Sequence, residues 1–105
     1  MKPVTFLGNS LSRIRDFPDD ARTTVGFQLS EVQFGRDPWD WKPMTAVGPG
    51  VREIRVREAS GAFRVLYLAT LPDRILVLHA FIKKSQATPR HDIELAARRL
   101  REWKE

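Results

Sequence analysis

Five cationic side chains lie near the ends of three consecutive segments that alternate as β-strands do: Arg55, Arg57, Arg64, Lys83 and Lys84. Arg55 and Arg57 share one strand face by the two-residue period, and Arg64 begins the next strand after a short turn. Glu53 is the one compensating carboxylate expected nearby. Guanidinium groups that converge in this way suit a phosphate, because they bind its oxygens in pairs and stabilise added negative charge.

The same spacing is compatible with a plain surface. If the strand face is solvated, its arginines can pair with Glu53 and Glu58, and such exposed ion pairs contribute little to stability. Both interpretations stay open at this point, because spacing alone does not show where the side chains meet.

The two histidines offer the remaining acid and base chemistry. His79 lies within an apolar run, which favours a hydrogen-bonded core residue, whereas His91 lies beside a basic helix start and is better placed for proton transfer. Two histidines on different elements with scattered carboxylates do not predict a metal site. Phosphate-loop and dinucleotide glycine patterns are absent as well, so we expect no metal and no cofactor.

The elements that hold these residues begin with a short strand over residues 3–7, which ends at a Gly-Asn turn and is typical of a sheet edge. A helix is predicted from Pro18, in its first turn, to a stop at Gly35. Its buried face is formed by residues spaced four, four and three apart: Ala21, Val25, Leu29 and Val32. Its other face is polar and includes Gln28.

Residues 36–50 hold three prolines and two glycines, so we expect a connection with at most a short helical turn. Trp39 and Trp41 are interpreted as packing residues at a core edge, because an indole ring buries a large area. Base stacking is the alternative role for them.

Residues 51–58, 63–70 and 74–82 predict three antiparallel strands joined by short turns. The third has apolar residues on both faces, so it should be central and covered on both sides. A terminal helix beginning near Arg90 repeats Ile93, Ala97 and Leu100 on one face, and its other face is basic. The order strand, helix, proline-rich connection, three strands and helix predicts an α+β fold with a mainly antiparallel sheet.

Length and composition limit the number of domains and the kinds of site that the chain can have. The chain has 105 residues, 18 Lys and Arg against 13 Asp and Glu, and no cysteine, which predicts a single domain over residues 1–105 without disulfides or thiolate metal sites. Residues 1–50 carry equal numbers of acidic and basic side chains, so the net charge of +5 lies in residues 51–105. No signal peptide or membrane span is evident, so we expect a cytoplasmic protein with no membrane partner.

Several motifs together resemble a known family. They are Val51-Arg52-Glu53-Ile54-Arg55, Gly61-Ala62-Phe63-Arg64-Val65-Leu66-Tyr67, Val77-Leu78-His79-Ala80-Phe81-Ile82-Lys83-Lys84, Thr88-Pro89 and a final helix rich in Ala and Arg. In this combination the chain resembles the phage-derived Gp49-like branch of the RelE/HigB toxins over nearly its full length. The resemblance implies a small RelE-like domain that acts with a cognate antitoxin, expected to be a helix-turn-helix protein. It further implies a ribonuclease that cuts messenger RNA at the ribosome without a metal.

The resemblance also assigns roles to residues. Arg64 matches the strand arginine expected to hold the scissile phosphate, and Lys83 or Lys84 matches the basic pair at the end of the last strand. Arg55 and Arg57 match the adjacent basic strand and are expected to bind RNA, as is Arg90. These six residues, together with a base, would complete the site.

The base departs from the family pattern. Relatives place a tyrosine or histidine near the C-terminus, whereas here the only tyrosine, Tyr67, lies in the second strand and Trp103 cannot titrate. His91 is the substitute that we assign; a lysine of lowered pKa, or catalysis mainly by electrostatics, are the alternatives. A module of the same fold that binds RNA or an antitoxin without cleavage is the alternative function.

Overall fold

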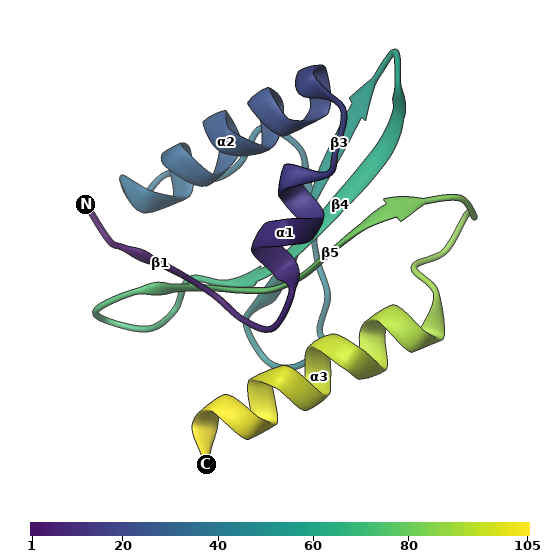
Figure 1. Ribbon diagram of the computed structural model, residues 1–105. Coiled ribbons are helices and arrows are strands. Elements are labelled where there is room, and N and C mark those ends of the chain that lie inside the picture. Colours follow the sequence, from purple (N-terminus) through teal and green to yellow (C-terminus); the bar gives the residue numbers. More distant parts are fainter.

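The structure is a computed structural model that describes residues 1–105, and it contains one sheet of five strands in the order β1-β5-β4-β3-β2 (Figure 1). The strands are β1 (Val4–Phe6), β2 (Trp41–Pro43), β3 (Val51–Glu58), β4 (Gly61–Leu68) and β5 (Ile75–Lys83). Only β1 runs parallel to its neighbour, β5; the other pairs are antiparallel. The predicted α+β fold with a three-stranded meander is therefore confirmed.

Two helices, α1 (Ser10–Arg15) and α2 (Asp19–Gln33), cover one face of the sheet (Figure 1). The four apolar positions predicted for α2 are all buried there against β3, β4 and β5, because their spacing of three and four places them on one side of the helix. Phe17, between the two helices, packs on Phe63 of β4 with ring centroids 4.8 Å apart. Gly35 ends the helical region with φ of 82°, a conformation that favours glycine.

The third helix, α3 (Arg90–Lys104), packs on the opposite face, over a second core that includes Leu66, Leu68, Leu76 and Leu78. Residues 44–51 contribute Met44, Val47 and Val51 to the same core. With α1 and α2 on one side and α3 on the other, β5 is buried from Ile75 to Phe81, as its two apolar faces predict.

The face beneath α3 changes character along β3 and β4. Alternate residues of β3 run from buried Val51 through Glu53 to Arg55 and Arg57, while those of β4 run from Leu68 and Leu66 to Arg64. Apolar side chains thus lie under the helix, and charged ones lie beyond it towards the β3–β4 turn. This uncovered half of the face carries the candidate site.

Several sequence expectations need correction. The proline-rich connection contains the short strand β2 instead of a helical turn, because Trp41 to Pro43 extend the sheet edge by pairing with Ile54 to Arg52. Trp39 is 65% exposed and stacks on the exposed ring of Phe27, so it is not a core residue.

Trp41 is half-buried, with the Arg52 guanidinium 3.9 Å from the ring centroid. Gln28, expected on the polar face of α2, is buried because its Oε1 accepts the backbone N–H of Trp39 at 3.1 Å. Helix α1 was not anticipated from the sequence. A bilayer-crossing segment is not found among the three helices, none of which combines the length and apolar character that crossing requires.

Candidate active site

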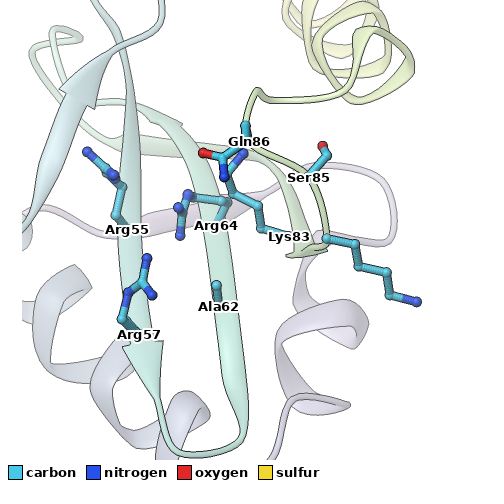
Figure 2. Close-up of a pocket in the computed structure, with 8 residues that line it drawn as sticks. Arg55, Arg57, Ala62, Arg64, Lys83, Ser85 and Gln86 are labelled. Atoms are coloured by element: carbon cyan, nitrogen blue, oxygen red, sulfur yellow. The ribbon is translucent and has the colours of Figure 1, made fainter.

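A cavity of about 390 Å³ opens on the uncovered half of the sheet face. It is lined by residues of β3, β4 and the end of β5 with its following loop: Arg55, Arg57, Ala62, Arg64, Lys83, Lys84, Ser85 and Gln86. Figure 2 shows the arginines projecting from β3 and β4, with Lys83 reaching towards them from the end of β5. The cavity is therefore built almost entirely from polar and cationic groups.

Strand register brings these side chains together. Arg55 lies directly opposite Arg64 across the β3–β4 pair, and Ala62 lies opposite both Arg57 on β3 and Lys83 on β5. Like charges opposite one another in a sheet destabilise it. The small side chain of Ala62 leaves space between its two cationic neighbours, and an anion of phosphate size in that space would relieve their repulsion.

Most of the cations in the cavity have no counter-ion within the protein. No carboxylate forms an ion pair with Arg55, Arg57, Lys83 or Lys84. Arg55 Nε and Lys83 Nζ are in addition shielded from solvent and have no hydrogen-bond partner. Buried donors without partners carry a desolvation cost, which a bound ligand that accepts hydrogen bonds would remove.

The one acid of the cluster is Glu53, which is fully buried beneath it. Glu53 Oε1 lies 3.5 Å from Arg64 Nε, and Oε2 accepts a hydrogen bond from Thr88 Oγ1 at 2.6 Å. Arg64, 4% exposed, also donates from Nη1 to the carbonyl oxygen of Phe63 at 3.0 Å. Glu53 therefore holds the Arg64 guanidinium and, through Thr88, ties the loop before α3 to the sheet.

The pairing of strand arginines with Glu53 and Glu58 is found only in part. Glu58 accepts a hydrogen bond from Thr24 Oγ1 of α2 and pairs with no arginine of the cavity. Lys42 forms a second ion pair with the buried Glu53 carboxylate, with Nζ 3.7 Å from Oε1. Arg55, Arg57, Lys83 and Lys84 form no ion pair, so the expected pairing with strand carboxylates is not found for them, although Arg57 and Lys84 are exposed to solvent.

Burial and like charge change the proton affinity of Lys83. Its pKa is lowered, first by burial of the ammonium group and then by the nearby Arg64 guanidinium, while Glu53 opposes the shift. The pKa of Arg64 is lowered as well, chiefly by burial. An arginine stays protonated in proteins, so of these two side chains Lys83 is the one that can lose its proton.

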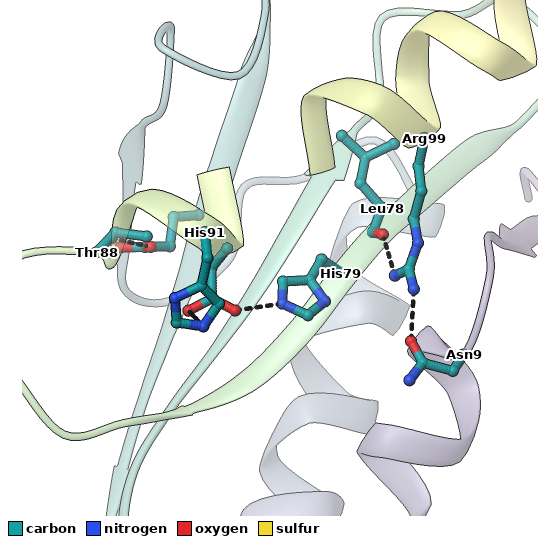
Figure 3. Close-up of polar contacts among 8 residues, drawn as sticks. Asn9, Leu78, His79, Thr88, His91 and Arg99 are labelled. Atoms are coloured by element: carbon teal, nitrogen blue, oxygen red, sulfur yellow. Dashed lines mark hydrogen bonds and ion pairs between the residues drawn. The ribbon is translucent and has the colours of Figure 1, made fainter. Parts of the chain in front are cut away.

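Two of the predicted site residues lie elsewhere. His91 is 82% exposed, with Nε2 at 3.3 Å from Asp92 Oδ2, and it lines a neighbouring cavity (Figure 3). Arg90 is 91% exposed and pairs with Glu94 at 2.8 Å. Neither side chain lines the cavity of the strand cations, whereas the other five predicted residues all do.

His79 is buried and hydrogen-bonded through Nε2 to Asp92 Oδ1, which confirms its prediction as a core histidine (Figure 3). Burial lowers its pKa, although Asp92 opposes this shift. This histidine therefore ties α3 to β5 and takes no part in the cavity.

Thr88, Ser85 and Gln86 were not identified from the sequence as parts of the site. The Thr88–Glu53 contact joins residues 35 positions apart. The Thr88-Pro89 pair contributed to the family resemblance, but only the folded loop shows that the Thr88 hydroxyl reaches a buried carboxylate.

Removing the Thr88 hydroxyl should destabilise the protein. In Thr88→Val the buried Glu53 carboxylate loses its closest donor, which should lower the free energy of unfolding by about 1–3 kcal/mol in urea titrations. Thr24→Val is the matched control, because its hydroxyl binds Glu58 at the solvent boundary and its loss should cost less than about 1 kcal/mol. Equal losses in the two variants would contradict the role of the Thr88–Glu53 contact.

The cavity should bind inorganic phosphate. Replacing chloride by phosphate at constant ionic strength should raise the melting temperature. At a phosphate concentration of ten times Kd, the free energy of unfolding should increase by about 1.4 kcal/mol. Arg57→Ala should abolish most of this increase, because it removes a cation that lines the cavity, and it breaks no ion pair of the free protein. The control Arg98→Ala removes the same charge from the exposed face of α3; if it has the same effect as Arg57→Ala, binding is not specific to the cavity.

Comparison with known proteins identifies the family of the chain. Residues 12–101 match the model of one protein family, described as phage derived protein Gp49-like (DUF891). No curated protein matches the chain significantly. The matched span contains every side chain of the cavity and all elements except β1, the first two residues of α1 and the end of α3. The chain therefore belongs to the phage-derived Gp49-like family, a family of RelE/HigB-type toxin-like proteins.

Proposed function

We propose that residues 1–105 form a toxin domain of a type II toxin-antitoxin system, which cleaves messenger RNA at the ribosome without a metal and so stops translation. Its partners would be the ribosome, the message and a cognate antitoxin of helix-turn-helix type, and it would act in the cytoplasm. Membership of a toxin-like family supports the toxin module and the antitoxin partner.

One observation carries the proposal: cations from three adjacent strands, of which only Arg64 has a carboxylate partner, line one cavity of about 390 Å³. Cleavage of RNA by its own 2′-hydroxyl passes through a phosphorane with an additional negative charge. Fixed cations that surround the phosphorus centre stabilise this charge more than that of the ground state, which is the requirement for catalysis. Arg64, Arg55 and Arg57 are placed to serve this purpose.

The proposed reaction transfers protons as well as charge. The ribose 2′-oxygen attacks the adjacent phosphorus, the P–O5′ bond breaks, and the products are a 2′,3′-cyclic phosphate and a 5′-hydroxyl end. A base takes the proton of the 2′-hydroxyl, and an acid gives one to the departing 5′-oxygen. Neutral Lys83 would be the base, and the ammonium group of Lys84 at the rim would be the acid.

Lys83 replaces His91 as our candidate base on geometric grounds. Lys83 lines the cavity and its pKa is lowered, so its neutral form is populated at lower pH than for an ordinary lysine. His91 lies outside the cavity, so it would contact RNA only where the RNA extends beyond the cleaved linkage. Arg90, exposed at the start of α3, would contact RNA outside the cavity in the same way.

The alternative is a module that binds RNA or an antitoxin without cleaving. It is favoured by the content of the cavity, which holds neither a histidine nor a tyrosine nor an exposed carboxylate. Binding would then require the cations alone, and the lowered pKa of Lys83 would have no consequence.

Expression of the chain alone in bacteria should arrest growth, and cavity variants should relieve the arrest. Arg57→Ala and Arg64→Lys are the preferred substitutions, because neither leaves the buried Glu53 carboxylate without a neighbouring cation. Loss of one transition-state donor should lower cleavage by about 100- to 1000-fold. Purified variants should show native melting curves. Arg98→Ala should still arrest growth; RNA binding by the wild-type chain without growth arrest or cleavage would instead support the noncatalytic module.

The rate should depend on pH through Lys83. Because the neutral amine acts as base, kcat/KM should rise with pH up to the lowered pKa of Lys83, which lies below the ordinary value of 10.5. Lys83→Arg cannot deprotonate, so this rise should be absent and the rate low at every pH. Lys84→Arg should be slower but keep the rise. The same pH profile in wild type and Lys83→Arg would show that another group is the base.

A further inference from the structure

A second cavity, of about 320 Å³, lies beside the first at an unpaired stretch of sheet edge. Strand β1 pairs with β5 only from Ile75 to Val77, so the rest of β5 has no neighbouring strand on that side. Helices α1 and α3 flank this open edge (Figure 1). Arg99 of α3 donates from Nη1 to the carbonyl oxygen of Leu78 and from Nη2 to Asn9 Oδ1, which closes the edge next to β1 (Figure 3).

The second cavity combines free cations with an apolar wall. Arg13 comes from α1 and Lys84 from the loop after β5, and neither forms an ion pair. Ile82, 48% exposed, provides the apolar surface together with Pro89, and the largely exposed His91 imidazole lies beside them with Nε2 3.3 Å from Asp92 Oδ2. Asp92, the one acid of the lining, is buried and hydrogen-bonded to His79.

The two cavities share Lys84 and Ser85 in their walls, so they adjoin at the end of β5. We propose that the second cavity binds the RNA nucleotide next to the cleaved linkage, with its phosphate at Arg13 and Lys84 and its base against Ile82, Pro89 and His91. This inference rests on the proposed function and extends the site from one phosphate to two successive nucleotides. His91 then binds RNA instead of acting as the base.

The chemistry of the lining favours a nucleotide over other anions. A flat base needs an accessible apolar or aromatic surface, and a phosphodiester needs donors that are not already paired; this cavity has both within one volume. Helix α3 adds to this, because its N-cap, Pro89, provides no side-chain cap and the first N–H groups of the helix carry partial positive charge. The shared wall makes the two phosphate positions consecutive along one strand.

The test uses a three-nucleotide RNA with 2′-O-methyl sugars, which cannot be cleaved, and measures its Kd by calorimetry. Arg13→Ala should weaken binding about tenfold, the loss expected for one charge-assisted hydrogen bond. Arg15→Ala, an equal change of charge on the same helix but outside both cavities, should leave the Kd unchanged. Stabilisation by inorganic phosphate, which needs only the first cavity, should be the same in both variants.

A second variant tests the base contact. His91→Ala should weaken the binding of the trinucleotide more than it weakens the binding of a trimer with abasic sugars in the flanking positions, because only the trinucleotide has bases there that can stack. Equal weakening of both trimers, or equal Kd values for Arg13→Ala and Arg15→Ala, would overturn the inference.

Failure of the proposed function gives a different pattern. If Arg57→Ala leaves the trinucleotide Kd unchanged, the first cavity does not bind RNA and the proposed site is wrong. If Arg57→Ala weakens binding and Arg13→Ala does not, only the second cavity is excluded. A different outcome is that a polyglutamate peptide binds more tightly than RNA and loses this binding in Arg13→Ala. That result would assign the second cavity to an acidic protein segment and reject the nucleotide.

Discussion

Repulsion among cations that the sheet holds in fixed positions is the constraint on which this structure depends. Arg55 lies opposite Arg64, and Lys83 lies across Ala62 from Arg57, because the register of the antiparallel strands leaves no other arrangement. The apolar layers on both faces supply the stability that keeps these groups together. An arrangement of this kind is costly in the free protein and becomes favourable when an anion binds, which is a form of preorganisation.

The position of the site follows from the partial cover that α3 gives to its face of the sheet. Under the helix, alternate residues of β3 and β4 are apolar; beyond it, they are charged. Glu53 lies at this boundary, fully buried, with Arg64 on one oxygen and Thr88 on the other. A buried carboxylate is tolerated there because it is hydrogen-bonded and surrounded by cations. It links the orientation of Arg64 to the loop that carries Ser85 and Gln86.

Two types of cation divide the work in the cavity. Arginines stay charged and offer paired donors, which suits them to hold a phosphate, whereas a lysine can lose its proton. Burial and the neighbouring guanidinium lower the pKa of Lys83, so the like charge beside it favours loss of its proton, as the proposed role of a base requires. Bound phosphate would raise this pKa again, since an opposite charge favours the protonated form.

The sequence by itself determined the strands of the meander, the two long helices and the face shared by Arg55 and Arg57, because periods of two and of three to four residues are local properties of the chain. It also indicated the five strand cations, through their types and their family resemblance. Only the tertiary structure decided that Trp39 lies exposed, that β2 extends the sheet and that Thr88 reaches Glu53. It likewise placed His91 outside the cavity that Arg55, Arg57, Arg64 and Lys83 line, because contacts between distant segments depend on how the layers pack, and local spacing carries no record of that packing.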